Sequence, residues 1–172
     1  MRGSVSRAGW TVLVLCGIAA LHAQAPDASS SGSPAKGASV PSHAKGTFDV
    51  KVTPVPGDAS SPSPVARMTL TKTLHGDLEG TGVGEMLAAN TSVEGSAAYV
   101  AIERITGTIG GRSGSFMLQH TGTMTRGAPH LVVTVVPDSG TGDLVGLTGT
   151  FDIIIAGGKH SYDFAYSLPL DH

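Results

Sequence analysis

The sequence predicts an all-β domain that folds as a small antiparallel barrel of about eight strands, with a β-sandwich as the alternative. Two observations point to strands: apolar and polar residues alternate with a period of two in several short runs, and turn-forming residues separate these runs. A third observation concerns helices, because no segment carries an apolar stripe of helical period long enough for a confident helix.

The alternating runs fall within residues 43–172, which we take as the barrel domain. Phe48, Val50 and Val52 alternate with polar residues, and residues 68–74 do the same, although Lys72 interrupts their apolar face. We expect strands at about residues 45–53, 66–75, 77–89, 93–104, 106–109, 114–124, 130–137 and 144–168, the last being a hairpin that turns at Gly157-Gly158.

Closure into a barrel is expected because it removes the exposed edges that consecutive antiparallel strands otherwise leave. Gly76, Gly80, Gly82 and Gly84 share one face of the chain, and glycines within strands mark the bends that a small curved barrel needs. Residues 131–136 are apolar on both faces, so this strand is expected to be the most buried of the sheet.

Residues 1–25 have the pattern of a secretory signal peptide. Arg2 and Arg7 supply positive charge, and residues 10–21 form an apolar stretch shorter than the roughly 20 residues that span a bilayer. The small-x-small pattern Ala23-Gln24-Ala25 then fits a signal peptidase. We therefore expect an exported protein, periplasmic or secreted, with no integral membrane segment after cleavage.

Cleavage after Ala25 would also remove the only cysteine, Cys16, and with it any thiol or disulfide chemistry. Leu15 is large where a lipoprotein cleavage box requires a small residue, which makes a lipoprotein the lesser alternative.

Residues 26–42 are rich in Ser, Ala, Pro and Gly and are expected to be a disordered spacer. The remaining chain has nine Lys and Arg against thirteen Asp and Glu, so it offers no basic surface for nucleic acid.

Charged residues interrupt the apolar pattern in two of the predicted strands. Both faces of residues 97–105 are mainly apolar, so Glu103 on one face or Arg104 on the other is expected to point away from bulk solvent. A charge buried without a partner costs several kcal/mol, so a partner, a water-filled lumen or protonation is expected. Glu85 lies in a similar setting, between two apolar residues of its own face.

The functional interpretation gathers five polar side chains in the mouth or lumen of the barrel, as the few polar groups of an apolar pocket: Glu85, Tyr99, Glu103, Gln119 and His120. A carboxylate in such a pocket has a raised pKa and can act as a general acid or base, so Glu85 and Glu103 are the candidate catalytic residues. The candidate ligand-binding residues are Tyr99, Arg104, Gln119 and His120. In the structural alternative, either glutamate only fixes strand register by pairing with Arg104, Arg112 or Arg126.

Neither a metal ion nor a cofactor is expected. The histidines are scattered singly, without the paired spacing of zinc ligands. Residues 138–143 are rich in oxygen ligands but lack the rest of an EF-hand loop. No nucleophile elbow or phosphate-binding loop occurs in the sequence.

Several separate motifs in the domain form a recognisable set. They are Gly84-Glu85-Met86-Leu87, GSAAYVAIERITGT at 95–108, GRSGSFMLQH at 111–120, Gly122-Thr123-Met124, VPDSGTG at 136–142 and GKHSYDF at 158–164. Over about residues 43–168 the chain resembles the DUF3224 family, a family of unknown function. The resemblance implies an allene oxide cyclase-like barrel of eight antiparallel strands, calycin-like in shape.

The same resemblance implies little about activity. Allene oxide cyclases bind an oxidised fatty acid in an apolar cavity and steer its ring closure with the help of a glutamate, but no motif carries those residues onto this chain. They are oligomeric, which allows a homo-oligomer here, although the sequence shows no interface. Likeness of fold does not fix function.

Three hypotheses follow. The one we favour is an exported barrel that binds a small apolar or amphipathic molecule in its lumen. The second is a cofactor-independent isomerase or cyclase that uses a lumenal glutamate as acid or base. The third is a barrel whose polar interior is purely structural.

Overall fold

The structure, a computed structural model, describes residues 41–57 and 64–169. It contains the strands β1 (Ser42–Pro54), β2 (Ala66–Gly76), β3 (Leu78–Asn90), β4 (Ala97–Ile109), β5 (Arg112–Thr125), β6 (Ala128–Val135), β7 (Thr141–Gly142), β8 (Thr148–Ala156) and β9 (Lys159–Ser167). Within the described ranges there is no helix. The predicted signal peptide and all but the last two residues of the predicted spacer lie outside them.

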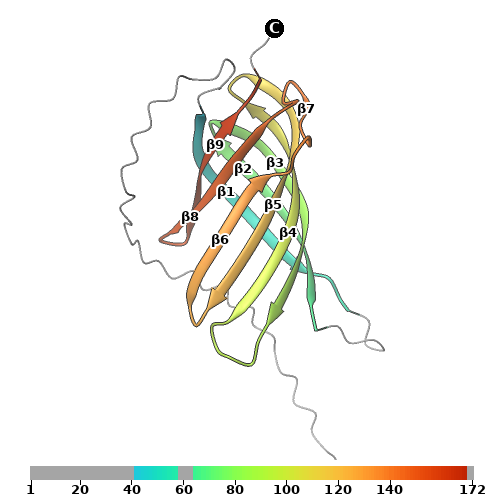
Figure 1. Cartoon of the computed structure of the whole chain (residues 1–172), viewed down its shortest axis with the longest axis vertical. Helices are drawn as coiled ribbons and strands as arrows, with labels where there is room; N and C mark the ends of the chain where they lie inside the picture. The colour runs from blue at the N-terminus through green and yellow to red at the C-terminus, as the bar shows by residue number, and fades with distance from the viewer. Residues whose placement is uncertain (1–40, 58–63, 170–172) are drawn as a thin grey trace, which may run out of the picture.

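Eight of these strands form one closed antiparallel barrel (Figure 1). β1 to β5 are neighbours in chain order, β6 follows β5, and β8 and β9 lead back to β1. The short strand β7 is an addition beside β5. The predicted all-β barrel is therefore confirmed, and the sandwich alternative is wrong.

One predicted break between strands is wrong. Residues 93–104 and 106–109 were expected to be two strands, but β4 runs through without interruption from Ala97 to Ile109. Gly107 lies opposite Gly80 of β3 on one side and Gly114 of β5 on the other, so pairing continues on both sides of the glycine. A glycine in a strand marks a close approach of neighbouring backbones here, not an end.

The barrel is least tightly joined between β6 and β8, a junction that we call the β6–β8 seam. In the described chain these two strands pair at a single position, Thr134 opposite Thr150. Figure 1 shows the tip of the β8–β9 hairpin standing apart from β6. The prediction that residues 131–136 form the most buried strand is accordingly wrong, because Leu131 and Val132 are 38% and 44% exposed.

One end of the barrel, which we call the closed end, is filled by side chains. The rings of Phe116 and Phe164 stack with centroids 5.6 Å apart, and those of Phe151 and Tyr162 with centroids 5.0 Å apart. The hydroxyl of Tyr162 accepts a hydrogen bond of 3.0 Å from the backbone N–H of Leu78. Each such fully buried side chain contributes about 1.5–3 kcal/mol, so this end supplies much of the stability.

The other end, which we call the open end, lies where β3 turns into β4 and β5 turns into β6. Its inward-facing side chains are apolar or aromatic and only partly buried, namely Met86, Ala88, Tyr99, Met124 and Ile155. The ring of Tyr99 lies against the backbone of Gly122, in the space that a side chain at position 122 would need. The interior therefore changes from a filled core at one end to a less covered apolar wall at the other.

Candidate functional site

Three ionisable side chains meet inside the barrel, between the closed end and the open end. Glu103 is fully buried, and the side chains of Lys72 and His120 are 3% and 6% exposed. Oε2 of Glu103 accepts a hydrogen bond of 2.7 Å from Nζ of Lys72 and lies 3.1 Å from Nε2 of His120. We call these three residues the lumenal cluster.

The period of two along each strand places the lumenal cluster inside. Lys72 follows Leu70 on the inward face of β2, Glu103 follows Ala101 on that of β4, and His120 follows Leu118 on that of β5. His120 is opposite Ala101 in the β4–β5 register and is therefore a diagonal neighbour of Glu103. Lys72 is farther away in the sheet, because β3 lies between β2 and β4.

Gly82 of β3 allows the contact between Lys72 and Glu103. It lies opposite Lys72 in the β2–β3 register, and a Cβ atom there would overlap Oε1 of Glu103. The same Cβ atom would lie 2.9 Å from Cδ1 of Ile105. The missing side chain therefore gives the carboxylate room to extend over β3 and reach the ammonium group.

Aromatic rings surround the ammonium group of Lys72. Its Nζ lies 4.7 Å from the ring centroid of Phe48 in β1 and 5.8 Å from that of Phe151 in β8. A cation near the face of an aromatic ring is attracted to it, more strongly where water is excluded. The ammonium group of Lys72 thus lies between one carboxylate and two rings.

The environment keeps Glu103 ionised. Burial raises the pKa of its carboxyl group, but the hydrogen bond with His120 and the charge and hydrogen bond of Lys72 together outweigh burial and hold the pKa below the usual 4.5. One carboxylate oxygen, Oε1, is buried and has no hydrogen-bond partner among the described residues. An unpaired buried acceptor is unusual in a folded protein and costs about 1–3 kcal/mol.

This lowered pKa predicts a loss of stability in acid. Glu103 binds its proton less readily in the folded chain than in the unfolded one. Its contribution to the free energy of unfolding is therefore present above about pH 4.5, and it is lost as the pH falls through the pKa of Glu103 in the folded chain. We expect the urea midpoint of the wild type to fall below pH 4.5 more steeply than that of the double variant Lys72→Met, Glu103→Leu. Parallel pH profiles for the two proteins would contradict the assignment.

The structure brings three of the six predicted site residues into the barrel. Glu103 and His120 are in contact, and Tyr99 faces inward towards the open end. Glu85, Arg104 and Gln119 lie outside, so the expectation that Glu85 and Gln119 share the lumen is wrong. Each of the three is one residue away from an inward-facing position on its strand.

The three outer residues have ordinary surface environments. Arg67 makes two hydrogen bonds to the Glu85 carboxylate, of 3.0 Å and 2.7 Å, and both side chains are more than half exposed. This guanidinium lowers the pKa of Glu85, through its hydrogen bonds first and its charge second. Nη1 of Arg104 lies 3.4 Å from Oγ of Ser115, and Gln119 is exposed.

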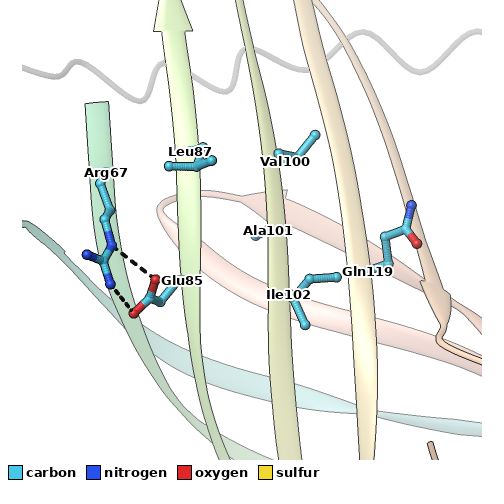
Figure 2. Close-up of a pocket in the computed structure, with 7 residues that line it drawn as sticks. All are labelled: Arg67, Glu85, Leu87, Val100, Ala101, Ile102 and Gln119. Atoms are coloured by element: carbon cyan, nitrogen blue, oxygen red, sulfur yellow. Dashed lines mark hydrogen bonds and ion pairs between the residues drawn. The ribbon is translucent and has the colours of Figure 1, made fainter. Parts of the chain in front are cut away.

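An open hollow of about 530 Å³ lies on the outer face of β2 to β5 (Figure 2). Its lining residues are Arg67, Glu85, Leu87, Val100, Ala101, Ile102 and Gln119. The side chain of Ala101 itself is buried on the inner face, so this residue borders the hollow through its backbone. The hollow is therefore separated from the lumenal cluster by the wall of the barrel.

Lys72 is the site residue that sequence reasoning missed. Its signal was present, because it interrupts an apolar face whose other members, Met68, Leu70 and Leu74, are all buried. The structural alternative expected Glu103 or Glu85 to pair with Arg104, Arg112 or Arg126. That expectation named the wrong cations, since Glu103 pairs with Lys72 and Glu85 with Arg67.

Two classes of feature are absent from the described residues. No helix in residues 41–57 and 64–169 is long and apolar enough to cross a membrane. No three His, Cys, Asp or Glu side chains in the same ranges gather in a group that could hold a metal ion.

Comparison with known proteins decides the family. The model of the family described as "Protein of unknown function (DUF3224)" matches residues 44–166. The chain belongs to the DUF3224 family. A crystal structure of a protein of unknown function from the same family, from Shewanella oneidensis MR-1, shares 47% sequence identity and superposes with a TM-score of 0.70.

That alignment covers 76% of this chain and 99% of the other. Nearly the whole length of that solved protein therefore aligns with the domain of this chain. No match was found among proteins with curated descriptions.

Proposed function

We propose that this DUF3224 protein is exported and that its barrel binds a small apolar or amphipathic molecule in the open end, with the polar part of the molecule at the lumenal cluster. The observation that carries the proposal is the position of a nearly fully buried ionic cluster, with one unpaired carboxylate oxygen, below a partly covered apolar wall. Binding pockets for small molecules combine apolar walls with a few polar groups in this way. Export is supported by the signal-like pattern of residues 1–25.

The β6–β8 seam supports the same proposal, because it offers a route to the interior. Where β6 and β8 are unpaired, the inward-facing Leu131 is 38% exposed. A ligand that enters between these strands has to separate only one pair of residues, Thr134 and Thr150.

The isomerase hypothesis has weaker support. A general acid at neutral pH needs a raised pKa, whereas the surroundings of Glu103 lower its pKa. The carboxylate is also held by Lys72 at 2.7 Å, which makes it a weaker base. Binding without turnover is therefore the function that the geometry favours.

A pair of matched variants tests lumenal binding. Ala88 faces inward and Ala89 outward at neighbouring positions of β3, and both are partly buried. We expect the neutral dye N-phenyl-1-naphthylamine to bind the wild type, Ala88→Trp to weaken binding at least tenfold, and Ala89→Trp to leave it unchanged. Fluorescence titration measures the three dissociation constants.

Dye binding that is absent from the wild type, or that Ala88→Trp leaves intact, would contradict lumenal binding. Weakening by Ala89→Trp alone would place the dye on the outer face. Native mass spectrometry of protein purified from its own host should in addition show a bound small molecule. The mass of the protein itself reports whether residues 1–25 have been removed.

A further inference from the structure

The lumenal cluster has hydrogen-bond acceptors left over and few donors. Glu103 is ionised, so Nε2 of His120 must carry the proton of their 3.1 Å contact. In a neutral imidazole the other ring nitrogen, Nδ1, then carries a lone pair and can only accept. Among the described residues no hydrogen bond to Nδ1 occurs, and the His120 side chain is 6% exposed.

The other two residues of the cluster do not change this balance. Oε1 of Glu103 is buried and has no hydrogen-bond partner among the described residues. Lys72 donates to Oε2 of the same carboxylate, and its ammonium group is otherwise next to the rings of Phe48 and Phe151. A molecule that reaches the cluster must therefore bring a hydrogen-bond donor.

Lys72 and Glu103 already balance each other's charge, because one buried cation faces one buried carboxylate. A ligand anion would add a charge without a partner and would bring acceptors to a place that lacks donors. A ligand cation would bring donors, but it would lie close to the Lys72 ammonium group. Both kinds of head group would carry the cost of an uncompensated buried charge.

We infer that the ligand is a neutral apolar molecule with a hydroxyl group, which donates a hydrogen bond to Nδ1 of His120. The hydroxyl group is the smallest neutral donor that an apolar molecule can carry into the interior of the barrel. The inference rests on the proposed function and specifies which small molecules the barrel takes.

Three probes with the same chain and different head groups test it: 1-octanol, octanoate and octylammonium. We expect calorimetric titration of the whole chain at neutral pH to give an affinity for 1-octanol at least tenfold higher than for either ion. His120→Phe should weaken 1-octanol binding about tenfold, which corresponds to the loss of one hydrogen bond. Glu85→Gln on the outer face is the matched control and should leave binding unchanged.

A second measurement uses the wild type, in case His120→Phe does not fold. On addition of 1-octanol, the ¹⁵N resonance of Nδ1 of His120 should shift, while the ring nitrogens of the outward-facing His130 should not. Equal or tighter binding of octanoate, or an unmoved Nδ1 resonance with 1-octanol bound, would overturn the inference and leave lumenal binding standing. If the dye also fails to bind the lumen, the proposed function itself is wrong.

Discussion

Replacement of Lys72 by methionine is expected to lower the free energy of unfolding by about 3–5 kcal/mol, the usual cost of removing one partner from a buried ion pair. The fully buried Glu103 would keep only His120, because Lys72 supplies the 2.7 Å hydrogen bond and the balancing charge. Removal of both charges should be far less harmful. The double variant Lys72→Met, Glu103→Leu is therefore expected to recover most of the lost stability.

Urea unfolding of the wild type and the variants measures this, with the slope of the transition checked for each protein. Lys45→Met is the matched control, because Lys45 pairs with Asp163 at the exposed surface and its loss should leave the midpoint unchanged. A Lys72→Met variant as stable as the wild type would show that the pair is not a buried charge pair. A double variant no better than the single one would show that volume, and not charge, dominates.

The second large effect is expected at Gly82, where one added methyl group should cost about 3 kcal/mol. The methyl group would occupy the space of Oε1 of Glu103, so the carboxylate would have to leave Lys72. The three atoms nearest to this methyl group all belong to the side chains of Glu103 and Ile105. In a Glu103→Ala background the same Gly82→Ala change should therefore cost much less, because only the flexible end of the Ile105 side chain would still have to shift.

A double-mutant cycle over Gly82 and Glu103 isolates this coupling from the intrinsic effect of replacing glycine. Gly57→Ala is the reference, since no atom lies within 4 Å of the added methyl group there. Equal costs of Gly82→Ala in both backgrounds would show that the glycine serves the curvature of β3 and not the contact between Lys72 and Glu103. Thermal or urea unfolding of the four proteins gives the coupling energy directly.

The sequence predicted most of the barrel because alternation directly reflects which face of a strand is buried. The same alternation also indicated Glu103, since a charge on an apolar face needs an explanation. It could have excluded Arg104 and Gln119 as lumenal partners, because each is adjacent in sequence to an inward-facing residue, Glu103 or His120. Neighbouring residues of one strand cannot both face the lumen.

Other features needed the strand register in three dimensions. Lys72 and Glu103 lie on strands that are not neighbours, and their contact depends on the glycine between them. No pattern within a single strand contains that relation. The exposure of Leu131 and Val132 was equally hidden, because an apolar run looks the same whether or not another element covers its side.

The pairing of β1 with β9 has a consequence for how the chain folds during its synthesis. The first strand of the barrel hydrogen-bonds to the last one, with Ser42 opposite Tyr166 and Phe48 opposite His160. During synthesis the chain can form its hairpins one after another, but the ring cannot be completed until the final strand has left the ribosome. Until then one edge of β1 remains open, and only the full-length domain is free of that exposed edge.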